Sequence, residues 1–228
     1  LIMKYLDGQE LTVDEIRLGL RLAIRKGVLV PVLCAAGAAN LGVGALLDTL
    51  VAFVPSPADV APEPAKNAAN QAEMTVAPTS STLGALVFKT SADPFVGKQT
   101  FFRVYSGMIS ADSRVWNPKH NNEERIGSAF ISRGKETINV KLIHAGDIGQ
   151  VAKLGETVTG DTLCDRAHVL NLPNPAYPNA LFRVAVNPKT QADSTKISST
   201  LTRLCEEDMT LSWMMEPATS QTILQGMG

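Results

Sequence analysis

Residues 93–116, DPFVGKQTFFRVYSGMISADSRVW, constrain the fold of this 228-residue chain more than any other stretch. Bulky residues that favour β-strands stand at its centre, at positions 101–102 and 104–105. A Ser-Gly pair at 106–107 interrupts them, and a second short apolar run follows at 115–116. This pattern predicts a strand, a turn and a returning strand.

More strand candidates follow at short, regular intervals, and Gly-containing turns separate them. The candidates are residues 86–90, 100–105, 114–117, 124–130, 137–142 and 148–153. Strands at such spacing indicate an antiparallel barrel or sandwich.

The first 54 residues read as helix, helix, strand and helix. Thr12 with Glu15 three residues later predicts a capping box at a helix start. The apolar run at 28–33 predicts a short buried strand. Apolar residues at helical spacing over 43–54 predict a further helix that ends before Pro55. A strand followed by a helix fits the last unit of an α/β sheet.

The C-terminal part predicts the order β-α-β-β. A strand is expected at 180–186, a helix over about 190–207, and two strands around 210–215 and 221–224. Thr190 and Asp193 can cap this helix. The acidic run 206–208 at the end of the helix is expected to be a solvated helix end rather than a catalytic site.

Composition divides the chain into four parts. Residues 58–82 are rich in Pro, Ala, Asn and Gln and are poor in bulky apolar side chains, which predicts a linker. The expected domains are residues 1–57, 83–168 and 169–228, and the Pro-rich stretch 168–179 is a second connection. The chain begins at a Leu within a predicted helix, which favours a fragment.

Charge and cysteine content exclude several function classes. A net charge of -1 argues against a protein held on nucleic acid mainly by electrostatics, and no DNA partner is expected. The three cysteines have no C-x-x-C spacing, so neither a zinc site nor a disulfide framework is indicated, and three buried free thiols are expected. No signal peptide or membrane span is apparent, which favours a cytoplasmic protein without a membrane partner.

Aromatic and histidine side chains offer no catalytic constellation. His120, His144 and His168 lack a partner at ligand or triad spacing, so each is interpreted as exposed or locally bonded. Trp116 and Trp213 fall in predicted strands, where core or interface roles are expected. No catalytic or metal-ligating residue is predicted.

Four stretches closely resemble elongation factor G, a translational GTPase. They are the run at 93–116 and the segments ETVTGDTL at 156–163, VNPKTQAD at 186–193 and QTILQGMG at 221–228. The resemblance implies a multidomain α+β fragment. Its expected parts are an α/β remnant of the GTPase domain, the antiparallel β-barrel of translation factors as domain II, and a partial ferredoxin-like α/β sandwich as domain III.

This family uses GTP and Mg²⁺, but the sequence lacks the family's phosphate-binding G-x-x-x-x-G-K-[ST] loop. The fragment is therefore not expected to be an enzyme, to bind a nucleotide or to need a cofactor, whereas the intact parent is expected to be a GTPase. Only a remnant of the guanine loop is suggested by the resemblance, at Ala36 and Gly37, where the family has Ser-Ala.

The resemblance also implies a partner, the small-subunit ribosomal RNA, which the barrel would contact. Candidate RNA contacts, chosen by residue type and location, are Arg103, Arg114, Lys119, Arg125 and Lys135. In the intact parent, GTP hydrolysis would drive movement of transfer RNA and messenger RNA on the ribosome. Two alternatives stay open: a paralogue for ribosome recycling or ribosomal protection, and a β-barrel module for protein interactions unrelated to ribosomes.

Overall fold

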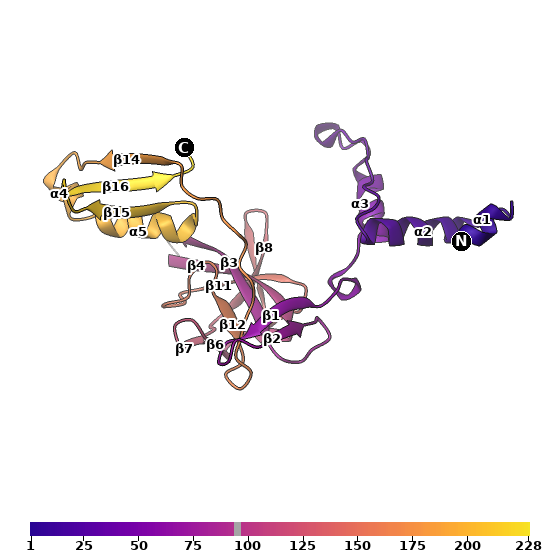
Figure 1. The fold of residues 1–228 in the computed structure, drawn as a ribbon, viewed down its shortest axis with the longest axis horizontal. Coiled ribbons are helices and arrows are strands. Elements are labelled where there is room, and N and C mark those ends of the chain that lie inside the picture. The colour runs from indigo at the N-terminus through magenta and orange to yellow at the C-terminus, as the bar shows by residue number, and fades with distance from the viewer. Residues whose placement is uncertain (94–96) are drawn as a thin grey trace. The chain divides into compact units, whose positions relative to one another are not determined.

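The computed structural model describes residues 1–93 and 97–228, so residues 94–96 of the predicted strand-turn-strand run lie outside the described part. The chain divides into two compact units, Leu1–Ala61 and Pro62–Gly228. Figure 1 shows the helices of the first unit, the strands of a barrel, and a small sheet near the C-terminus.

The first unit is helical. Its α-helices are α1 (Ile2–Leu6), α2 (Val13–Arg25) and α3 (Val43–Phe53), and its 3₁₀ helices are η1 (Gly37–Ala39) and η2 (Pro57–Asp59). The predicted capping box is confirmed, because the Thr12 hydroxyl accepts from the Glu15 N–H and the Glu15 carboxylate accepts from the Thr12 N–H. Helix α3 ends before Pro55, as expected.

The strand predicted at residues 28–33 is wrong. These residues form neither helix nor strand, and Val28, Val30 and Val32 are 79–90% exposed. A strand needs a neighbour for its N–H and C=O groups, and residues 1–61 supply none. The first unit contains no buried residue, so its apolar side chains lack a shared core within that unit.

The second unit begins with a hairpin where the linker was predicted. Strands β1 (Glu63–Asn67) and β2 (Glu73–Val76) pair antiparallel, and β1 also pairs with β13 (Leu170–Asn171). Ala65 and Val76 are buried against Leu170 and Leu172. The few apolar residues of this stretch therefore suffice to attach it to a sheet, which corrects the interpretation of residues 58–82 as wholly linker.

The barrel strands form an eight-stranded antiparallel sheet in the order β7-β6-β12-β3-β4-β11-β8-β9, and β5 and β10 form a separate pair. Their bounds are β3 (Gly84–Asp93), β4 (Gly97–Ser106), β5 (Met108–Ser110), β6 (Arg114–Asn117), β7 (Asn122–Arg125), β8 (Ala129–Arg133), β9 (Glu136–Val140), β10 (Leu142–His144), β11 (Ile148–Ala152) and β12 (Thr162–Cys164). The antiparallel strands predicted for the middle of the chain are thereby confirmed, although the candidate at 124–130 is two strands, β7 and β8.

Strand pairing in the barrel differs from the simple hairpin that the sequence suggests. Strand β4 pairs with β3 and β11, whereas β5 pairs with β10 and β6 pairs with β7 and β12. Alternate residues of β4 point inward, and Phe102 and Val104 are fully buried in the core. Gly107 redirects the chain between β4 and β5 at a φ of 66°.

Gly107 provides a test of this close approach. A Cβ at this position would lie 2.8 Å from the Leu83 backbone N and Cα. We expect Gly107→Ala to lower the free energy of unfolding by about 3 kcal/mol, since backbone strain and overpacking add. The control is Gly134→Ala, where φ is 61° but no atom lies within 4 Å of the added Cβ. Urea unfolding should show a cost of about 1 kcal/mol for the control, from φ alone; equal costs would contradict the close approach.

The C-terminal part has the predicted β-α-β-β order. It consists of β14 (Phe182–Val186), α4 (Gln191–Ser194), α5 (Ile197–Glu207), β15 (Ser212–Glu216) and β16 (Gln221–Gly226). The sheet order is β14-β16-β15, and α5 lies along this sheet in Figure 1. Thr190 and Asp193 form the expected capping box, but it begins the short α4, so the single helix expected over about 190–207 is two helices. The Trp213 indole N–H donates to Thr202 of α5.

Candidate functional site

Two arginines stand opposite each other on the outer face of the β6–β7 hairpin. Arg114 and Arg125 are Cα partners across the two strands, and both are exposed. The next pair, Val115 and Glu124, points inward and is buried. Like charges directly opposite each other are unfavourable, and a phosphate that accepts from both guanidinium groups would relieve the repulsion.

An aromatic ring lies on the same outer face. Trp116 is partly buried in β6, and the Arg166 guanidinium carbon lies 4.9 Å from the centroid of its ring. Glu123 is paired with Arg114 by a salt bridge and supplies an acidic group on this face. We call Arg114, Trp116, Arg125 and Arg166 the hairpin face. Its chemistry, cationic donors beside an aromatic ring, suits RNA phosphates and bases.

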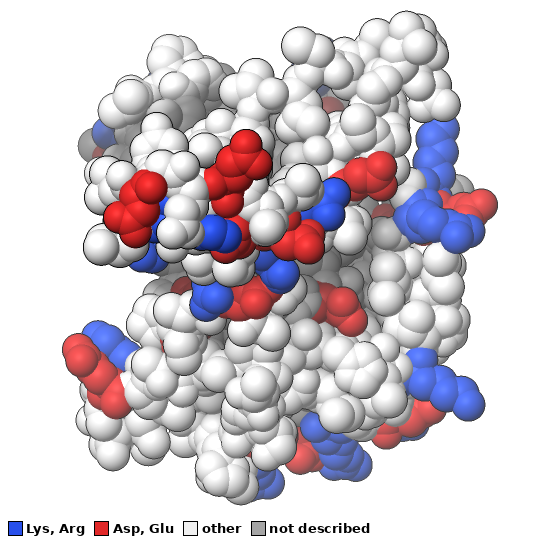
Figure 2. Space-filling view, turned by 90° about the vertical axis from the view of Figure 1, so that its right-hand side faces the viewer, with Lys and Arg blue, Asp and Glu red and all other residues white. Residues whose placement is uncertain are grey.

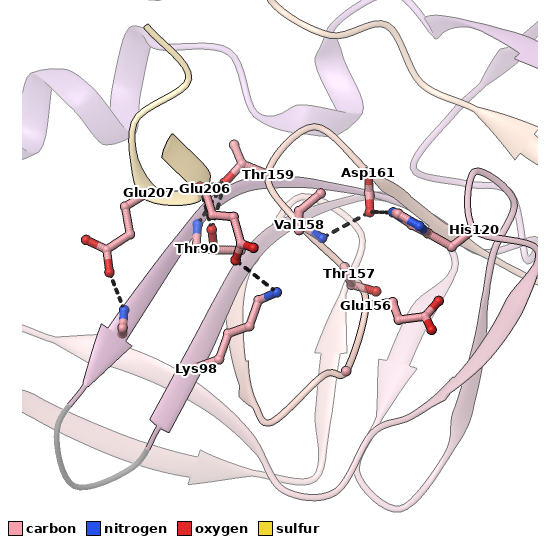
Figure 3. Close-up of polar contacts among 12 residues, drawn as sticks. Thr90, Lys98, His120, Glu156, Thr157, Val158, Thr159, Asp161, Glu206 and Glu207 are labelled. Atoms are coloured by element: carbon pink, nitrogen blue, oxygen red, sulfur yellow. Dashed lines mark hydrogen bonds and ion pairs between the residues drawn. The ribbon is translucent and has the colours of Figure 1, made fainter. Parts of the chain in front are cut away.

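Lys119 lies in the turn of the same hairpin, but its amine is engaged. Its Nζ is 2.8 Å from Oδ1 of Asp161, which is 1% exposed. The other carboxylate oxygen accepts from Asn117 Nδ2 and the Val158 N–H, each at 3.0 Å, and lies 3.0 Å from His120 Nε2. His120 is thus locally bonded, as expected, and Figure 3 shows it beside Asp161.

The remaining two candidates lie elsewhere. The Arg103 guanidinium carbon is 4.9 Å from the centroid of the Tyr105 ring in β4, and Lys135 is exposed in the turn between β8 and β9. The structure therefore brings Arg114, Lys119 and Arg125 together on one hairpin and adds neither Arg103 nor Lys135 to it. On the face shown in Figure 2, basic and acidic side chains are intermixed rather than gathered by sign.

A second carboxylate fixes the loop before β12. Glu124 is 7% exposed and accepts from the N–H groups of Gly155, Glu156 and Thr157 and from the Thr157 hydroxyl, at 2.9–3.1 Å. Burial raises the pKa of Glu124, but these hydrogen bonds outweigh it and leave the pKa below its ordinary value. Glu124 and Asp161 together position the start of the ETVTGDTL segment.

Thr159 of that loop contacts the C-terminal part. Its hydroxyl and that of Thr90 both donate to the Glu206 carbonyl oxygen, at 3.1 and 2.7 Å. The Glu207 carboxylate accepts from the Ala92 N–H at 2.7 Å, and Glu206 pairs with Lys98 at 3.5 Å. The expectation of a wholly solvated helix end at 206–208 is wrong, because two of its three residues dock on the barrel. Asp208 instead accepts from Thr210.

The two residues suggested as a remnant of the guanine loop lie in the first unit. Ala36 and Gly37 are exposed at the start of η1, where Ala36 forms a bridge with Leu41. Across the described residues, no group of three or more His, Cys, Asp or Glu is placed to hold a metal ion.

The cysteines differ in burial, which corrects one expectation. Cys164 is buried, Cys205 is partly buried and Cys34 is exposed, and all three are free thiols. Burial raises the pKa of the Cys164 thiol to about 11, which suits a core residue. In the part of the chain that the structure covers, no helix is long and apolar enough to cross a membrane.

Several contact residues carry little signal in the sequence. Thr90, Glu124, Asp161 and Arg166 come together only through strand pairing and tertiary contacts. The one clue was the ETVTGDTL segment, singled out by resemblance, whose Thr157, Thr159 and Asp161 side chains all make tertiary hydrogen bonds.

An antiparallel barrel followed by a helix-covered sheet defines a multidomain α+β fold. Comparison with known families is specific: residues 82–166 match the model of elongation factor G domain 2, and residues 177–228 match that of elongation factor G domain III. Together the matches cover more than half of the chain, which belongs to the elongation factor G family.

A solved structure supports this assignment. The chain is similar over its whole length to a crystal structure of a protein from Thermus thermophilus, with 25% sequence identity and a TM-score of 0.78. It spans about a third of that protein, 32% of its length. The predicted multidomain α+β fold class is confirmed, while the domain boundaries drawn from the sequence stay a prediction.

Proposed function

We propose that this chain is the ribosome-binding part of an elongation factor G-like protein of the cytoplasm, and that its barrel contacts small-subunit ribosomal RNA. The proposal rests on the presence of two consecutive translation-factor domains in this chain. The first of them presents the opposed pair Arg114 and Arg125. In the intact parent, GTP hydrolysis in a nucleotide-binding domain with bound Mg²⁺ would drive translocation of transfer RNA and messenger RNA.

Phosphate contacts orient a protein on RNA without reading its sequence. Arg114 and Arg125 can each donate to a phosphate, and Trp116 with Arg166 offers a flat cationic surface for an unstacked base. Lys119 can reach a phosphate only by giving up part of its contact with Asp161. Arg114 is also paired, with Glu123, but that pair lies at the surface, whereas Lys119 is held by the buried Asp161. We therefore rank the hairpin arginines first, and Lys119, Arg103 and Lys135 after them.

We expect the double variant Arg114→Ala/Arg125→Ala to bind ribosomes about 10- to 100-fold more weakly, since each charge-assisted contact contributes about 1 kcal/mol. Co-sedimentation with purified small and large subunits at several salt concentrations is the measurement. The slope of log affinity against log salt should fall by roughly 1.5 to 2. The control, Arg17→Ala/Arg25→Ala in α2, removes the same charge outside the barrel.

The outcomes separate the competing functions. Binding to the small subunit that depends on the hairpin arginines supports the proposal. A paralogue for recycling or protection would also bind ribosomes, and the intact parent would then be assayed for subunit splitting and for translocation. A protein-interaction module unrelated to ribosomes would pellet no more than an inert protein does, and that result would contradict the proposal.

A further inference from the structure

Strand β3 has a free edge in the barrel. It pairs with β4 along its described length, but with β12 only at residues 84–86. The loop before β12 continues the pairing for one step, through hydrogen bonds between Val87 and the backbone of residues 160–161. Beyond that point no strand among the described residues pairs with the second side of β3. An uncovered strand edge leaves backbone N–H groups without acceptors.

The C-terminal end of α5 covers this edge (Figure 3). The Thr90 N–H donates to the Thr159 hydroxyl at 3.0 Å, and the next outward N–H, that of Ala92, donates to the Glu207 carboxylate at 2.7 Å. Both threonine hydroxyls donate to the Glu206 carbonyl oxygen. Thr90 and Thr159 are 2% and 3% exposed, so these contacts lie away from solvent.

The end of α5 and the edge of β3 supply hydrogen-bond partners that the other lacks. The last carbonyl groups of a helix have no partner within the helix, and the two threonines supply donors to one of them. The helix C-terminus carries partial negative charge, and Lys98 brings a positive charge to Glu206 beside it. The strand edge in turn receives acceptors from Thr159 and Glu207. Separating the surfaces would expose all of these groups to water at once.

The covalent connection between the domains is extended. Residues 172–181 join β13 to β14 and form neither helix nor strand, and residues 173–179 are exposed. The named contacts between α5 and the barrel are polar, made by three hydroxyl or carboxylate side chains and one salt bridge. Small polar interfaces between domains permit relative motion.

We propose that Thr90, Thr159, Lys98, Glu206 and Glu207 form a polar latch that holds the third domain on the barrel. Breaking the latch frees the third domain to reorient about residues 172–181, while both domains stay folded. Thr159 and Glu207 hold the end of α5 against strand β3. The latch concerns contacts within this chain, so its failure would leave the proposed ribosome binding standing.

The test compares the tumbling of the two domains by ¹⁵N relaxation in the whole chain. In the unsubstituted protein, amides of β4 and of β14 should report one rotational correlation time. In Thr159→Val/Glu207→Ala they should report two, with the shorter one in the third domain. The matched control Glu136→Ala/Thr137→Val makes the same changes on the exposed strand β9 and should retain a single time.

Two results would overturn the latch: separate tumbling in the unsubstituted protein, or unchanged common tumbling in the latch variant. The single variant Glu207→Ala provides a second test in case the double variant does not fold. Glu207 is partly exposed, so its replacement should leave the fold intact. In that variant, hydrogen exchange at the Ala92 amide should rise at least about tenfold, whereas exchange at Phe102 stays unchanged. Unchanged exchange at Ala92 would contradict the role of Glu207.

Discussion

Replacing Glu124 by Ala is expected to lower the free energy of unfolding by about 3 kcal/mol. The carboxylate accepts four hydrogen bonds from residues 155–157, and its loss leaves the fully buried Thr157 N–H and hydroxyl without that acceptor. Hydrogen bonds to a charged group contribute about 1.5–3 kcal/mol, and unmet buried donors add a penalty. Because the substituted residue lies inside the barrel, the whole domain should be affected.

Chemical denaturation of the chain measures this effect. Glu136→Ala, an exposed change in β9, should alter stability by no more than about 0.5 kcal/mol. A cost below about 1 kcal/mol for Glu124→Ala would show that the loop at residues 155–157 does not depend on this carboxylate.

Acidification should act on the same group. The pKa of Glu124 is lower in the folded protein than its ordinary value, so its contribution is complete above the ordinary value and is lost as pH falls through the folded-state pKa. Glu124→Gln keeps an acceptor but cannot titrate. Its stability should therefore fall less between about pH 5 and pH 3 than that of the unsubstituted protein. Parallel pH profiles would contradict this assignment.

Replacing Phe102 by Ala should lower the free energy of unfolding by about 4 kcal/mol. The ring is fully buried in the barrel core, and a Cβ built on Gly149 would lie 3.0 Å from it and 2.2 Å from Ile143 Cδ1. Because the neighbouring atoms are already packed this closely, they cannot move in to fill the space left by the ring, so truncation leaves a cavity.

Phe101 is the matched control for this change. It carries the same side chain one position earlier in β4, is only partly buried and contacts Lys89 through its ring. Phe101→Ala should cost about 1 kcal/mol, from lost area and a weak cation–π contact. Similar costs at the two positions, by urea unfolding, would contradict the inward and outward assignment of the two rings.

Local signals predicted much of the fold correctly. Capping boxes at Thr12 and Thr190, the strand at 100–105 and the β-α-β-β order depend on residues close in sequence, and the structure confirms them. Such features follow from side-chain spacing and short-range hydrogen bonds.

Errors occurred where distant residues decide the outcome. The apolar run at 28–33 lacks a strand to pair with, while residues 63–76 form a hairpin because Leu170 and Leu172 lie against them. The sequence patterns had predicted a strand at 28–33 and a linker over 58–82. Pairing partners belong to the tertiary fold, and single-sequence periodicity does not report them.

The candidate site shows the same division. Residue type and location selected Arg114 and Arg125 as candidate RNA contacts, but their opposition across two strands depends on the register of the β6–β7 pair. Arg166 joins Trp116 from a separate loop, and Glu206 and Glu207 reach the barrel across more than a hundred residues of sequence. These contacts join residues that are far apart in sequence, so local sequence patterns do not report them.

Chemical probing of ribosomal RNA in the presence of the chain tests the central claim most directly. We predict that the unsubstituted chain protects a discrete set of small-subunit RNA positions, that Arg114→Ala/Arg125→Ala loses this protection, and that Arg17→Ala/Arg25→Ala retains it. Absence of small-subunit protection by folded chain at saturating concentration, or identical protection by all three proteins, would contradict the assignment of the barrel's hairpin face as the RNA-binding surface.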